Sequence, residues 1–163
     1  MEAAAAVKNL IERERTVCTE LAEVLHAERD ALTRFSADDV TECVRRKDGL
    51  HAQLSALASE RRRAVEHLGR ALGVGGGDGR VTSLLPGLPP VTAAELRHAV
   101  AGLRRILLET RRLQRVNGVL ADASLRMVGE LLRAYRQLLP GTRYDGRAMV
   151  TPGPAPDALD QRV

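Results

Sequence analysis

Histidine and cysteine are the residues of this chain best suited to bind a metal or act as nucleophiles. None of the histidines lies in an HExxH arrangement or in any other recognised metal spacing, so we expect surface imidazoles: His26, His51, His67 and His98. Cys18 and Cys43 fall on apolar positions of helical patterns and form no CxxC motif. We expect them to be small core residues in a reducing cytoplasm. The sequence predicts no metal site and no cofactor.

The sequence also offers no candidate residues for acid–base or nucleophilic catalysis. The carboxylates are scattered along charged faces and are not paired among apolar residues, and no serine has a GxSxG context. The glycine run at 73–79 follows a helical pattern instead of a strand, and no GK[ST] comes after it. It is better interpreted as a linker than as a phosphate loop. We expect a protein that is not an enzyme and has no small-molecule substrate.

Clustered arginines suggest a second kind of chemistry, the binding of nucleic acid. They are Arg61, Arg62, Arg63, Arg104, Arg105, Arg111, Arg112 and Arg115. The net charge is +4, and residues 95–139 alone carry +5. Arginine exceeds lysine throughout the chain, and aromatic residues for base stacking are few. We therefore favour a solvated helix face with glutamate partners and expect no nucleic-acid partner, keeping nucleic-acid binding as the less favoured alternative.

Three helices must carry these residues. Apolar side chains recur every three or four positions, which predicts helices over about 2–34, 37–72 and 92–139. Ser36 with Asp38 and Asp39 caps the second helix, and the short connection predicts an antiparallel hairpin. Thr92 and Glu95 form a capping box for the third helix. No signal peptide or membrane span is recognised, so we expect no membrane insertion.

The predicted fold class is all-α, an elongated antiparallel three-helix bundle or coiled coil. Residues 1–139 form the helical domain, with a flexible linker at 73–91 and a disordered tail at 140–163 that is rich in Pro, Gly and Ala. Leucines among the prolines of 81–90 are compatible with a helical turn that covers one end of the bundle. The third helix is about 70 Å long against about 50 Å for the others, so roughly four of its turns have no partner helix.

The unpartnered part of the third helix begins near Asn117 and Gly118. An asparagine at a seam fixes register, and a glycine permits close approach of a neighbouring backbone; alternatively, the pair weakens the helix where it exchanges partners. Beyond this point the helix has more apolar surface than a hairpin needs, which predicts docking of an amphipathic helix. The expected binding residues are Asn117, Gly118, Leu120, Leu125, Val128, Leu131, Leu132 and Tyr135.

The layout resembles the FlgN family of flagellar export chaperones. The resemblance lies in an LxxxNGxLxxxSL motif and a YDGR segment: Leu113, Asn117, Gly118, Leu120, Ser124, Leu125, Tyr144, Asp145, Gly146 and Arg147. It implies a bacterial cytoplasmic chaperone of type III secretion. Its clients are the hook–filament junction proteins FlgK and FlgL, which it keeps from premature assembly and delivers to the export gate. It also implies that the C-terminal part of the chain carries client binding.

The resemblance further implies that Tyr144, Asp145 and Gly146 contact the export gate component FlhA. Another function fits the residues without the resemblance, a structural coiled-coil scaffold that self-associates through the same apolar stripe. A client complex distinguishes the chaperone from this scaffold, which forms homo-oligomers that clients do not change.

Overall fold

The computed structural model describes residues 2–74, 80–138, 142–144 and 150–152. Its chain divides into two units, Met1–Ala121 and Asp122–Val163. The first unit contains helices α1 (Glu2–Thr33), α2 (Ala37–Ala71), the short α3 (Val81–Leu84), a 3-10 turn at Leu85–Gly87 and the first part of α4 (Pro90–Leu138). The fold is the all-α bundle with a long last helix that the periodicity predicts.

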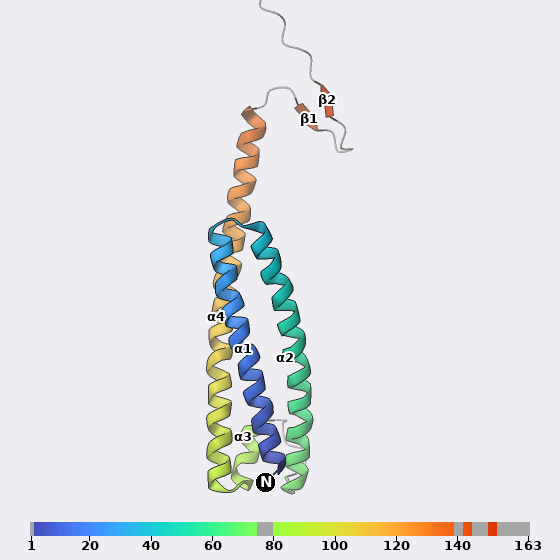
Figure 1. Cartoon of the computed structure of the whole chain (residues 1–163), viewed down its shortest axis with the longest axis vertical. Coiled ribbons are helices and arrows are strands. Elements are labelled where there is room, and N and C mark those ends of the chain that lie inside the picture. Colours follow the sequence, from blue (N-terminus) through green and yellow to red (C-terminus); the bar gives the residue numbers. More distant parts are fainter. Residues whose placement is uncertain (1, 75–79, 139–141, 145–149, 153–163) are drawn as a thin grey trace, which may run out of the picture. The chain divides into compact units, whose positions relative to one another are not determined.

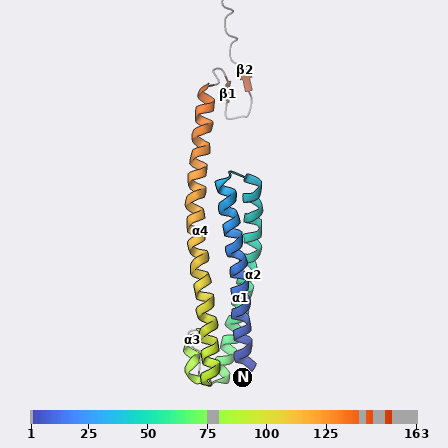
Figure 2. The same cartoon turned by 60° about the vertical axis from the view of Figure 1, so that its left-hand side comes forward.

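Helices α1 and α2 form an antiparallel hairpin, and α4 begins at the end where α1 begins (Figures 1 and 2). The hairpin turn is tight. Ser36 donates its backbone N–H to the Ala31 carbonyl over 3.0 Å, and Phe35 donates to the Leu32 carbonyl over 3.2 Å. Phe35 itself adopts a left-handed φ of 56°. This is a Schellman ending, which satisfies the last carbonyls of α1.

Helix α2 ends in the same motif with the residue that the motif usually prefers. Gly73 has φ 69°, and Val74 donates to the Gly69 carbonyl over 3.1 Å. A side chain in this left-handed region meets the following carbonyl, which glycine avoids. The C-terminal end of α1, with Phe35 in this conformation, therefore has more backbone strain than that of α2. The Phe35 side chain is 52% exposed.

The core of the first unit consists of two clusters along the bundle. The cluster near the start of α1 draws on all four helices, through residues that include Ile11, Val65, Leu84 and Leu96. The second cluster lies toward the hairpin turn and is built almost wholly by α1 and α2, with Leu113 as the only α4 residue among its buried members. The contribution of α4 to the core therefore falls along its length.

Two local expectations need correction. The segment 73–91 was expected to be a flexible linker with a helical turn within 81–90; the structure has this turn as α3 and the 3-10 turn, and Val81 and Leu84 are buried in the first cluster, so this part is packed and does not act as a flexible linker. Helix α4 begins at Pro90, so Thr92 lies inside its first turn and is not the capping residue. Proline is favoured at the start of a helix because its missing N–H has no partner there.

The second unit contains the C-terminal part of α4 and two short strands, β1 (Thr142–Tyr144) and β2 (Val150–Pro152). The strands pair antiparallel, with Tyr144 opposite Val150. The sequence did not predict this pairing in the tail. The rest of the tail expected to be disordered, including Asp145 and Gly146, lies outside the described residues.

Candidate functional site

The apolar surface of α4 changes character at Asn117. Its buried residues are Ala93, Leu96, Ala99, Leu103, Thr110, Leu113 and Asn117. They recur at heptad spacing, which is the pattern of a helix packed along a seam. In the described part of α4 after Asn117, no residue is buried. The core-facing stripe of α4 therefore ends at this asparagine.

Apolar side chains nevertheless continue along α4. We call the following set the C-terminal stripe: Leu125, Val128, Leu131, Leu132, Tyr135 and Leu138, all of them exposed. Their spacing of three, four and seven residues places them along one side of the helix. Monomeric proteins rarely leave such a contiguous apolar surface uncovered unless it binds a partner. The stripe is thus the strongest candidate for a binding surface in the described part of the chain.

Asn117 is different from the rest of the predicted site because it is 3% exposed. Its amide Nδ2 donates to the Leu25 carbonyl over 2.8 Å and to Glu28 Oε2 over 2.9 Å. The other oxygen of Glu28 accepts from Lys47 Nζ on α2. Asn117, Glu28 and Lys47 form what we call the polar junction, which links all three long helices. This arrangement favours the interpretation of Asn117 as a register device.

The remaining predicted residues are placed as follows. A Cβ added at Gly118 would meet nothing within 4 Å, so no neighbouring backbone approaches it in this structure. Leu120 is half-buried. Tyr144 is described only as part of β1. The structure therefore places Leu125, Val128, Leu131, Leu132 and Tyr135 on one exposed stripe of the second unit, whereas Asn117 is buried in the first unit.

A second buried ion pair accompanies the polar junction. Arg61 Nε on α2 donates over 2.7 Å to Glu14 Oε1 on α1, and Glu14 is buried. Glu14 and Glu28 are two heptads apart on α1, as are Arg61 and Lys47 on α2, so both pairs keep the same antiparallel register. Lys47 and Arg61 therefore meet glutamates of α1 where the helical pattern alone shows basic residues in otherwise apolar columns. The equal spacing of two glutamates in the apolar columns of α1 was the signal for their partners.

The other reactive groups are placed as structural or surface residues. All four histidines are exposed, and Cys18 and Cys43 are buried and free. Burial is the main cause that raises the pKa of both thiols, which disfavours the reactive thiolate. Among the described residues, no group of three or more His, Cys, Asp or Glu is placed to hold a metal ion. Nor does any described helix combine the length and apolar character that crossing a membrane requires.

A helical bundle with an uncovered apolar stripe on its longest helix is typical of small helical proteins that bind a protein partner. A comparison with known families agrees with this class. The family described as FlgN protein matches residues 1–151, and the chain belongs to the FlgN family. The protein is therefore a member of a family of flagellar export chaperones. Comparison with curated proteins gives no significant match. Comparison with solved structures gives none either.

Proposed function

We propose that this protein is a bacterial cytoplasmic chaperone of flagellar type III secretion whose clients are hook–filament junction proteins of the FlgK and FlgL kind. In this role it keeps a client from assembling prematurely and delivers it to the export gate. The observation that supports the proposal is the exposed C-terminal stripe on α4. A client helix laid along such a stripe buries apolar surface on both partners without nucleotide or covalent chemistry.

The proposed contact residues are those of the C-terminal stripe, with Leu120 at its beginning. Asn117 is too buried to touch a client directly, so we assign it to holding α4 against the hairpin. Gly118 directly follows Asn117 and precedes Leu120 in the chain, and it has open space around it. There a client backbone approaches α4 more closely than any side chain would permit.

The test of client binding uses matched exposed leucines of one helix. Leu131 is 60% exposed and Leu108 is 58% exposed, and both lie on α4. We expect Leu131→Glu to weaken binding of purified FlgK or FlgL at least tenfold by isothermal titration, and Leu108→Glu to change it less than twofold. Both variants should keep the unfolding midpoint of the parent protein. Equal effects of the two substitutions, or no complex with either client, would refute the proposal.

The self-associating scaffold is tested in the same samples. If the C-terminal stripe pairs two copies of the chain, sedimentation should show a dimer that Leu131→Glu dissociates and that clients leave unchanged. The chaperone proposal expects a client complex in place of such a dimer. A client-insensitive dimer would therefore favour the scaffold.

The gate contact is a separate proposal that rests on Tyr144, with Asp145 and Gly146 beside it. Tyr144→Ala should weaken binding to the FlhA cytoplasmic domain and leave client binding unchanged. Thr151→Ala, on the paired strand β2, is the matched control. Unchanged gate affinity of the Tyr144 variant would remove this residue from the gate contact.

A further inference from the structure

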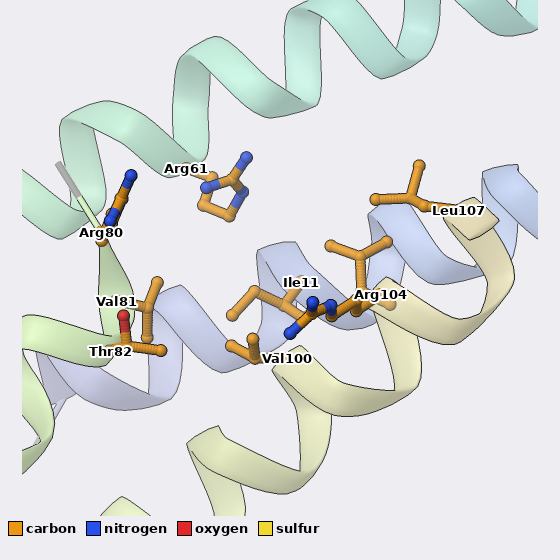
Figure 3. A pocket seen from close by; sticks show the side chains of 9 residues that line it. Ile11, Arg61, Arg80, Val81, Thr82, Val100, Arg104 and Leu107 are labelled. Carbon is orange, nitrogen blue, oxygen red and sulfur yellow. The ribbon is translucent and has the colours of Figure 1, made fainter. Parts of the chain in front are cut away.

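A cavity of about 290 Å³ lies in the first unit, shares no residue with the C-terminal stripe, and has a lining that combines apolar and guanidinium groups. Ile11 of α1 with Val100 and Leu107 of α4 supply apolar surface, and Val81 of α3 adds to it. Arginines from three different segments also line it, namely Arg61, Arg80 and Arg104 (Figure 3). Apolar surface beside convergent cationic groups is typical of a site for an anionic ligand with an apolar part.

The positive charge at this cavity is only partly compensated. Arg61 is paired with the buried Glu14, as described above. Arg104 is exposed, and no carboxylate of the described residues lies within 4.0 Å of its guanidinium. Its side chain points toward Ile11 and Val100 in Figure 3. Arg104 therefore offers an unpaired cation directly beside the apolar lining.

The positive charge of Arg104 belongs to a row of arginines along α4. Arg97 and Arg111 lie one heptad before and after Arg104, which places the three on the same face of the helix. Neither Arg97 nor Arg111 has an ion pair with a described carboxylate. Among the clustered arginines for which glutamate partners were expected, Arg61 has one in Glu14, whereas Arg104 and Arg111 have none among the described carboxylates. A partner with several negative charges would be complementary to this row.

The size of the cavity and its chemistry restrict the ligand. A volume of about 290 Å³ is at the lower limit of small-molecule sites and accommodates one or two apolar side chains. No lining residue is aromatic, whereas proteins that bind single-stranded nucleic acid stack bases on aromatic rings. An acidic polypeptide segment with an apolar side chain satisfies both the row of arginines and the apolar lining.

We propose that this cavity is a second protein-docking site, which takes an apolar side chain from an acidic segment of a partner while Arg97, Arg104 and Arg111 pair with the carboxylates of that segment. The site involves only residues of the first unit. It is independent of the proposed client contact, which uses the C-terminal stripe.

The test follows a methyl group in the cavity with an internal control. The chain has two isoleucines, Ile11 in the cavity and Ile106 outside its lining. The probe is a synthetic twelve-residue peptide with one leucine flanked by glutamates, added to the full chain with labelled isoleucine δ1 methyls. We expect the Ile11 signal to shift in a saturable way and the Ile106 signal to stay in place. Replacing the leucine by alanine, or the glutamates by glutamines, should weaken binding at least tenfold.

Neighbouring arginines of α4 provide the matched variants. Arg104→Glu should weaken peptide binding at least tenfold, whereas Arg105→Glu, an equal change of charge at the next exposed position, should change it less than threefold. Arg104→Gln makes the same test with a smaller change of charge. A silent Ile11 signal, or equal losses for the two glutamate variants, would overturn the proposal. So would a single-stranded oligonucleotide that shifts Ile11 where the peptide does not. Because Leu131→Glu leaves this site intact, failure here is distinguishable from failure of client binding.

Discussion

The Asn117 side-chain amide donates to the main-chain carbonyl of Leu25 over 2.8 Å, although the two residues are 92 positions apart in the chain. The same amide reaches Glu28, which in turn accepts from Lys47. Asn117 is also the last buried residue of α4 among those described. The boundary between the packed part of α4 and its exposed apolar part therefore coincides with a specific polar contact to α1.

Removing this contact should destabilise the bundle. Asn117→Ala leaves Glu28 without one of its donors, and we expect a loss of about 1–3 kcal/mol in the free energy of unfolding. Urea unfolding followed by circular dichroism measures it. The matched control is the other asparagine of the chain, Asn9, which is exposed; Asn9→Ala should stay within about 0.5 kcal/mol. Equal effects at the two positions would mean that the polar junction contributes nothing.

The buried ion pair between Glu14 and Arg61 allows a sharper comparison. Arg61→Met leaves a buried carboxylate without its partner, and we expect a loss of about 3 kcal/mol. The exposed pair Arg13–Glu60 joins the same two helices over 3.7 Å, and Arg13→Met should cost less than about 1 kcal/mol.

The same urea measurements include a rescue of the Arg61 variant. Adding Glu14→Leu to Arg61→Met removes the unpaired charge and should restore most of the stability. A double variant as unstable as Arg61→Met alone would contradict the assignment of the loss to an uncompensated charge.

The hairpin turn should tolerate a stabilising substitution. Phe35→Gly removes the side chain that strains the left-handed backbone at this position, and it should raise the free energy of unfolding by up to about 1 kcal/mol. At the equivalent end of α2, Gly73→Ala introduces the same strain and should lower stability by about 1 kcal/mol. Thermal unfolding of the two variants measures both. If Phe35→Gly is instead the less stable protein, the phenyl ring makes contacts that outweigh the strain.

The buried thiols predict a dependence on pH. Burial, with a smaller contribution from Glu14, raises the pKa of Cys18 above its value in the unfolded chain. The folded protein keeps a proton on Cys18 that the unfolded chain loses. The resulting contribution of Cys18 to the free energy of unfolding is complete below the ordinary thiol pKa. It is lost as pH rises through the folded pKa. Cys18→Ala should therefore show a flatter decline of the urea midpoint above about pH 9.

Alkylation provides a second measurement of the same residue. At pH 8 iodoacetamide should label Cys18 at least about a hundredfold more slowly in the native protein than in urea, because labelling requires opening of the core. Native Cys18 that reacts as fast as the unfolded thiol would contradict its placement.

Much of the fold could be predicted because its determinants are local. Apolar spacing along α1, α2 and α4 sets both the helical period and the face that is buried, and the short connection at Ser36 permits only an antiparallel hairpin. The end of the core-facing stripe near Asn117 could also be predicted, since it follows from the length of α4 relative to the other helices. The leucines of 81–90 suggested a helical turn over one end of the bundle, but the boundaries of α3 could not be predicted, because prolines and glycines around a four-residue helix leave no periodic pattern to recognise.

The helices, the hairpin and the apolar excess at the C-terminal end of α4 can be recognised from the amino-acid pattern, because each depends on residues close together in the chain. Which polar groups meet across helices is visible only in the packed bundle. Glu14, Glu28 and Asn117 stand on apolar columns of single helices, and their partners depend on the register between helices. The same holds for the cavity beside Arg104, whose lining comes from residues between Ile11 and Leu107 that only the packed bundle brings together.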